Sequence, residues 1–171
     1  PKTYLGPTQR YRQFMAHPSK VAIEVMKSFP KQTYRNRCTI TTPDGALTLS
    51  VPVQRADSKQ LTKDVEISYQ QKWQHQHWIA LVSAYKRTPY FDYYADFFRP
   101  FYEKETKFLV DLNEGLHGVI TQLIMNSEFK IQNSKFTSDW SGLDLEHCFG
   151  DGQSILDMLF RSEERRVGKE C

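Results

Sequence analysis

Short apolar runs bounded by turn residues dominate the first half of the chain, a pattern typical of β-strands. Strands are expected at Thr3–Leu5 and Val21–Met26. A helix is expected between them, from Thr8 to Ala16, because His17-Pro18 supplies a stop signal. This order of strand, helix and strand predicts a βαβ-like unit at the start of the domain.

A β-hairpin is expected next. Its strands are Arg37–Thr41 and Ala46–Val53, and the connecting Thr42-Pro43-Asp44-Gly45 contains an Asp-Gly pair, which is a strong hairpin signal. Val65–Ser68 is a candidate for one more short strand. The first half of the chain therefore predicts a small sheet.

The second half of the chain has helical spacing. Trp78, Leu81, Val82 and Tyr85 fall at i, i+3, i+4 and i+7, which places them on one helix face. Taken together, the two halves predict a mixed α/β fold. In this fold a small β-sheet from the N-terminal half, opening with the βαβ-like unit, is covered by helices from the C-terminal half.

Further helices follow the first one. Thr88-Pro89 suits the N-cap and N1 positions of the next helix, and Arg99-Pro100 is expected to break or restart it. Amphipathic spacing then continues through residues 101–110 and 112–125, with a bend expected between them, and a last helix is expected at residues 155–160.

The two ends of the chain do not look native. The chain opens on Pro1 without a methionine, and Arg161–Cys171 reads RSEERRVGKEC, which a common short-read sequencing adapter gives when translated. A native charged tail is the alternative interpretation. We therefore expect a single domain over residues 1–160, truncated at both ends, and a non-native tail over residues 161–171 that makes few contacts with it.

Charge and composition exclude several classes of function. The net charge is +3 for the whole chain and +2 without the tail, too close to neutral for a duplex nucleic-acid-binding protein. Cys38 and Cys148 are too few and too far apart for a disulfide scaffold or a structural zinc site, so a reducing cytoplasm is expected. No metal or cofactor site is expected, and no apolar run approaches the roughly 20 residues of a membrane span.

The segment Lys31–Cys38, with the sequence KQTYRNRC, is the candidate anion site. If the segment is extended, Arg35 and Arg37 share a face, and two guanidinium groups on one face can bind phosphate or carboxylate in bidentate fashion. A solvated edge strand is the alternative interpretation. Gln9 in the first turn of a helix also suits an anion. The predicted anion-binding residues are Lys31, Arg35, Asn36, Arg37 and Gln9.

A histidine and several tyrosines are candidates for the chemistry and for substrate contact. His77 stands at the start of a helix and titrates near neutral pH, so it is a candidate general acid/base at the mouth of a cleft. A buried histidine packed on Trp78 is the alternative interpretation. Tyrosine rings edged with hydroxyls suit sugar or nucleobase faces, although core packing explains them equally well. The predicted substrate contacts are Tyr34, Tyr85, Tyr90 and Tyr94.

Five separated blocks carry a family resemblance. They are YLGPTQRY, KQTYRNRC, VPV, HWIALVSAY with PYFDYYADFFRPFY, and SILDMLF, in this order along the chain. In sequence and order these blocks resemble the WbqC-like family of bacteria, which is associated with O-antigen and other surface-polysaccharide gene clusters.

The resemblance implies a cytoplasmic protein of surface-polysaccharide biosynthesis whose partner is a small-molecule substrate, either a nucleotide sugar or an acyl donor. Group transfer on a nucleotide-linked sugar is the expected reaction. In that reaction Arg35 and Arg37 hold the anionic group and His77 acts as acid/base. The rival hypothesis is a non-catalytic sugar- or nucleotide-binding module with an aromatic, basic groove. Convergence of His77 with either arginine within about 10 Å would favour the enzyme.

Overall fold

The computed structural model describes residues 3–11, 26, 28–29, 33–54, 60–89, 91–132 and 154–161. Its elements are β1 (Arg37–Thr42), β2 (Gly45–Ser50), the short 3₁₀ helix η2 (Thr62–Asp64), α2 (Trp73–Tyr85), α3 (Phe91–Glu103), α4 (Leu109–Gln132) and α6 (Ile155–Arg161). The fold is mixed, with a small sheet from the N-terminal half and helices from the C-terminal half, as the sequence predicts.

The predicted hairpin is confirmed. Strands β1 and β2 pair antiparallel in a register that places Arg37 opposite Ser50 and Thr42 opposite Gly45. Gly45 has φ 121°, a conformation that only glycine adopts without strain, so the Asp-Gly pair fixes the turn locally. Strand β2 ends at Ser50 instead of reaching Val53, because Val53 pairs with Ile67 in an isolated bridge.

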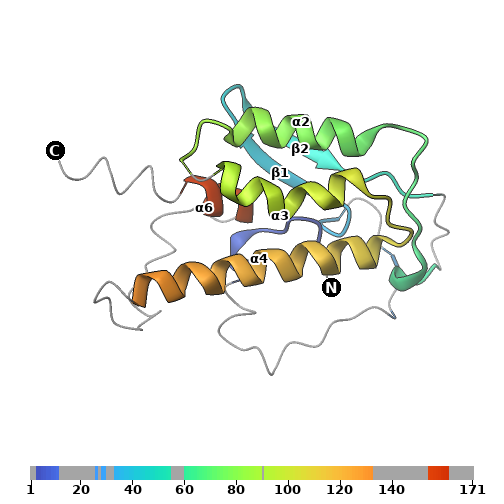
Figure 1. The fold of residues 1–171 in the computed structure, drawn as a ribbon. Helices are drawn as coiled ribbons and strands as arrows, with labels where there is room; N and C mark the ends of the chain where they lie inside the picture. Colours follow the sequence, from blue (N-terminus) through green and yellow to red (C-terminus); the bar gives the residue numbers. More distant parts are fainter. Residues whose placement is uncertain are drawn as a thin grey trace.

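The helices α2, α3 and α4 stack one below another in front of the hairpin (Figure 1). Leu81 and Tyr85 are buried, as the helical spacing predicts, and α2 begins at Trp73, five residues before the predicted face. A side chain at Gly115 of α4 would collide with the Phe101 ring of α3, so this glycine sets the close approach of the two helices. The predicted last helix is confirmed as α6, which buries Ile155, Leu156 and Phe160.

The predicted opening unit is wrong in its first strand. Tyr4 and Leu5 form a turn, and Leu5 has φ 42°, which is incompatible with a strand. A helical turn at residues 8–11 follows Pro7 as predicted, whereas residues 12–25, which include the predicted second strand, lie outside the described residues. The sheet that the structure describes is a two-stranded hairpin.

Two predicted helix boundaries are also wrong, and Thr88 contacts both of the helices beside it. Its hydroxyl donates to the Tyr85 carbonyl of α2 at 2.7 Å, and its own carbonyl accepts from the Phe91 N–H at the start of α3. Pro100 lies inside α3, in an exposed last turn where the carbonyl that it leaves without a donor can be solvated. The predicted helix over 101–110 is interrupted after Glu103, because Phe108 pairs with Glu66 before α4 begins.

Candidate functional site

Arg35 is buried at the centre of the predicted anion-binding segment. Only 7% of it is exposed, and its Nη1 donates to the Ser28 carbonyl at 3.2 Å and to the Thr62 hydroxyl at 2.6 Å. Residues 34–36 form a turn, so the segment is not extended and the inference that Arg35 and Arg37 share a face is wrong. The turn directs Arg35 inward.

Arg10 is the cation that lies near Arg35. It is partly buried in the helical turn at residues 8–11. Burial lowers the pKa of Arg10, the neighbouring Tyr11 raises it, and the positive charge of Arg35 lowers it further. The two cations are therefore within electrostatic range of each other. Two arginines in one region are a candidate site for an anionic ligand.

Helix α4 contacts both of the segments that carry these arginines. Asn113 donates from Nδ2 to the Arg35 carbonyl at 2.8 Å. One helical turn later, the His117 ring stacks on Tyr11 with ring centroids 5.1 Å apart. Residues one turn apart lie on the same helix face, so α4 fixes the two arginine-bearing segments against each other. We call Arg10, Tyr11, Arg35, Asn113 and His117 the arginine cluster.

Arg37 lies apart from the arginine cluster. Cys38 and Ile40 of β1 are buried in the core, so alternation along the strand places Arg37 on the opposite face of the hairpin. Its Nε is buried and has no hydrogen-bond partner in the described part of the chain. Asn36 donates from Nδ2 to the Val51 carbonyl at 3.2 Å, which ties the segment to the end of β2.

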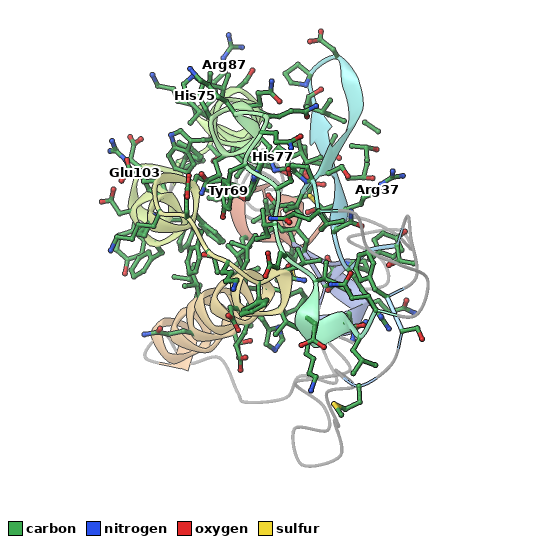
Figure 2. The ribbon with its side chains drawn as sticks, turned by 90° about the vertical axis from the view of Figure 1, so that its right-hand side faces the viewer. Arg37, Tyr69, His75, His77, Arg87 and Glu103 are labelled. Carbon is green, nitrogen blue, oxygen red and sulfur yellow. The ribbon has the colours of Figure 1, made fainter. Side chains whose placement is uncertain are left out.

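His77 is buried between α2 and the hairpin, with only 5% of its surface exposed (Figure 2). The Tyr4 hydroxyl lies 2.8 Å from Nδ1, and the ring also hydrogen-bonds to the backbone of Ser50. Burial lowers the pKa of His77 to about 4, although the Ser50 contact opposes the shift. The imidazole is therefore neutral at pH 7, and its Nε2–H donates to the Ser50 carbonyl while Nδ1 accepts from Tyr4.

The hydrogen-bond chain continues from Tyr4 to Tyr102. Their hydroxyl oxygens are 3.0 Å apart, and burial raises the pKa of both tyrosines, so each stays protonated and can donate. Because Tyr4 donates to His77, Tyr102 donates to Tyr4. Figure 2 shows Arg37 directed away from His77. Convergence of His77 with either arginine within about 10 Å stays a prediction.

The remaining predicted site residues are dispersed. Tyr85 is fully buried, and its hydroxyl donates to Asp157 Oδ1 at 2.7 Å. Tyr94 is partly buried, with its ring edge-on to Phe160. Tyr34 is 53% exposed beside Arg35, and Gln9 is exposed in the helical turn at residues 8–11. Two predicted residues, Lys31 and Tyr90, lie outside the described residues.

The sequence patterns did not identify several residues of the arginine cluster and of the surroundings of His77. Arg10, Tyr4, Asn113 and His117 are isolated polar or aromatic residues whose spacing gives no signal, since their partners are distant in sequence. Arg10 follows Gln9 directly, so the predicted helix start and Arg10 lie in the same segment. Tyr4, Asn113 and His117 reach their partners only in the folded structure, where segments that are distant in sequence come into contact.

Within the described residues, no group of three or more histidine, cysteine, aspartate or glutamate side chains is arranged to hold a metal ion. No helix in the same residues combines the length and the apolar character needed to cross a bilayer.

Comparison with known proteins gives one match. A family model described as the WbqC-like protein family matches residues 3–147, which include the arginine cluster, the hairpin and helices α2, α3 and α4. No curated protein and no solved structure matches the chain.

Proposed function

The chain belongs to the WbqC-like protein family, and we propose that it acts in the cytoplasm in bacterial surface-polysaccharide synthesis, by group transfer on a nucleotide-linked sugar. The arginine cluster carries this proposal. Arg10 lies within electrostatic range of Arg35, and the diphosphate of a nucleotide-linked sugar suits a site that holds two such cations. Arginine suits this role because its planar group can bind two phosphate oxygens at once.

Tyr34 and Gln9 extend the proposed ligand site. Tyr34 precedes Arg35 and exposes more than half of its surface, so its ring is accessible to the nucleobase or sugar of a ligand whose phosphates lie at the cluster. Gln9 precedes Arg10 and is exposed in the helical turn at residues 8–11, so its side chain is accessible to the same ligand. Both residues lie on the segments that carry the two arginines.

A non-catalytic binding module is the second candidate, and one observation favours it. His77 is closed off from solvent, and both of its ring nitrogens already hydrogen-bond to protein groups. A general acid/base must reach a substrate directly or through one water molecule. Both candidates require the same ligand to bind at the arginine cluster.

Substitution of Arg10 tests the shared binding step. Arg10→Gln is expected to weaken binding of a UDP-linked hexose about tenfold or more, because a hydrogen bond to a charged group contributes about 1.5–3 kcal/mol. The affinity of the variant should also depend less on salt, since one screened charge is gone. Isothermal titration calorimetry at two salt concentrations measures both effects.

The matched control is Arg87→Gln, which removes an exposed arginine in the turn after α2. It should bind the sugar nucleotide as the wild type does. Equal affinities for the Arg10→Gln variant and the wild type would refute the proposed site. Arg35→Gln is less suitable as a test because loss of its buried contacts with Ser28 and Thr62 would also lower stability.

Substitution of His77 separates the two candidates. If His77 transfers protons, His77→Gln should lower turnover while the affinity for the sugar nucleotide is kept. A protein that binds the sugar nucleotide and shows the same turnover with and without His77 would instead assign this residue to packing. The comparison is made above pH 7, where both proteins carry a neutral side chain at this position.

A further inference from the structure

The outer edge of strand β2 carries backbone groups that β1 does not use. The Val51 N–H donates to the Asn36 carbonyl at 2.8 Å, and this pair continues the register of the hairpin. In an antiparallel ladder every second pair is hydrogen-bonded, so the backbone N–H and C=O groups of Ala46 and Thr48 point away from β1. In the described part of the chain no backbone hydrogen bond satisfies these groups.

The side chains of β2 do not protect this edge. Residues 45–48 are all exposed, and the strand has no charged side chain, no proline and no bulge. Edge strands commonly use such features to prevent pairing with other chains. Leu47 exposes 39% of its surface, although it lies on the hairpin face that buries Leu49. The edge therefore combines free backbone groups with an apolar side chain that is only partly covered.

We propose that the β2 edge pairs with the same edge of a second copy of the chain, which gives a dimer with one four-stranded antiparallel sheet. The twofold axis passes between the two Leu47 residues. Ala46 of each copy then lies opposite Thr48 of the other, and the two pairs exchange backbone hydrogen bonds. None of these residues belongs to the arginine cluster, so the dimer is independent of the proposed function.

The free backbone groups select this register. Pairing centred on Thr48 would set Ala46 against Ser50, whose carbonyl already accepts from His77. Pairing centred on Ala46 would set Thr48 against the turn at residues 43–44, where the strand has ended. The register between these two uses only backbone groups that point outward and have no partner among the described residues.

The side chains at the proposed interface suit a second copy of this chain. Residues 45–50 carry no charge, so two copies meet without electrostatic repulsion. The central Leu47 pair is not hydrogen-bonded, and in such pairs the side chains are closest, so each leucine covers the exposed surface of the other. The contact is short, and a weak, concentration-dependent association is therefore expected.

Disulfide trapping tests the register. In a background with Cys148→Ser and Cys171→Ser, Leu47→Cys would place two Cα atoms about 4.5 Å apart across the axis, within the span of a disulfide. In Thr48→Cys the two Cα atoms would be roughly 9 Å apart, too far for a disulfide. With oxidised glutathione, Leu47→Cys is expected to form linked dimers about tenfold faster than Thr48→Cys on non-reducing gels.

A charge exchange at the axis gives a second test. Leu47→Lys and Leu47→Glu each place like charges opposite one another, so each variant alone should sediment as a monomer at concentrations where the wild type associates. An equimolar mixture of the two variants should restore the dimer. Because Leu47 is partly exposed, both variants are expected to fold, and circular dichroism checks this.

The contrary outcomes are specific. Equal crosslinking rates for Leu47→Cys and Thr48→Cys would overturn the proposed register. A wild-type protein whose Ala46 and Thr48 amide NMR signals stay fixed over about a hundredfold dilution would overturn the dimer. If these two amides resist hydrogen exchange equally at every concentration, another segment of the same chain covers the edge and the proposal fails.

Discussion

The wild-type protein is expected to lose about 3 kcal/mol of its free energy of unfolding through His77 alone as the pH falls from 6.5 to 4. The pKa of His77 is about 4 in the folded state against an ordinary value of 6.5. Between pH 4 and pH 6.5 His77 is protonated in the unfolded chain and neutral in the folded protein. This contribution is therefore fully present above pH 6.5, is lost as the pH falls, and changes no further below pH 4.

Burial is the main cause of this effect. The ring is packed edge-on against Trp73 with centroids 5.1 Å apart and accepts a hydrogen bond from Tyr4 at Nδ1. A proton added at Nδ1 would place two donors against each other and a charge in the core. The acidic form of the protein should therefore loosen first where the N-terminal turn, the hairpin and α2 meet.

Urea unfolding at a series of pH values measures the prediction. His77→Gln should be less stable than the wild type at pH 7, and the difference between the two proteins should shrink as the pH approaches 4. His75→Gln is the matched control, because His75 is exposed two residues earlier on the same helix. Parallel pH profiles for the wild type and His77→Gln would show that the burial of His77 carries no such penalty.

Local signals in the sequence predicted the hairpin and the helices. The Asp44-Gly45 pair acts within a few residues, and Gly45 does adopt the positive φ that the turn requires. The helical spacing around Leu81 and Tyr85 likewise depends on near neighbours. Such short-range patterns can be recognised in the sequence because the residues that form the pattern also make the contacts.

The errors arose where tertiary contacts decide local structure. Thr88 was a good N-cap by type, and its carbonyl does accept from the Phe91 N–H, but its hydroxyl satisfies the Tyr85 carbonyl of the preceding helix. Pro100 was a helix breaker by type, but it stands in an exposed last turn of α3 where the loss of one hydrogen bond is tolerated. In both cases the residue keeps its chemistry and the surroundings change its role.

The site was only partly predictable for a related reason. Arg35 was identified as a cation, but its inward direction depends on the turn at residues 34–36 and on Thr62, which the sequence pattern does not show. The contact of Tyr4 with His77 spans 73 residues, and that of Asn113 with Arg35 spans 78. Spacing along the chain carries no information about pairs this far apart.

Asp157→Ala is expected to cost about 3–5 kcal/mol of the free energy of unfolding, since a buried acceptor shared by two hydroxyl donors is removed. Asp157 is 3% exposed, and it accepts from Tyr85 at Oδ1 (2.7 Å) and from Thr41 at Oδ2 (3.0 Å). These contacts join α6 to α2 and to β1. Without the carboxylate the buried Tyr85 hydroxyl and the partly buried Thr41 hydroxyl lose this acceptor, and α6 loses these two polar contacts with α2 and β1.

A double-mutant cycle isolates the interaction free energy between Asp157 and Tyr85. Asp157→Ala and Tyr85→Phe, measured singly and together by urea unfolding, should be non-additive by about 0.5–3 kcal/mol, because the two residues share one hydrogen bond. Asp96→Ala is the matched control, as it removes an exposed aspartate from α3 and should change stability by no more than about 0.5 kcal/mol. Should Asp157→Ala prove as mild as this control, the apolar contacts of Ile155, Leu156 and Phe160, and not the carboxylate, would be what holds α6 in place.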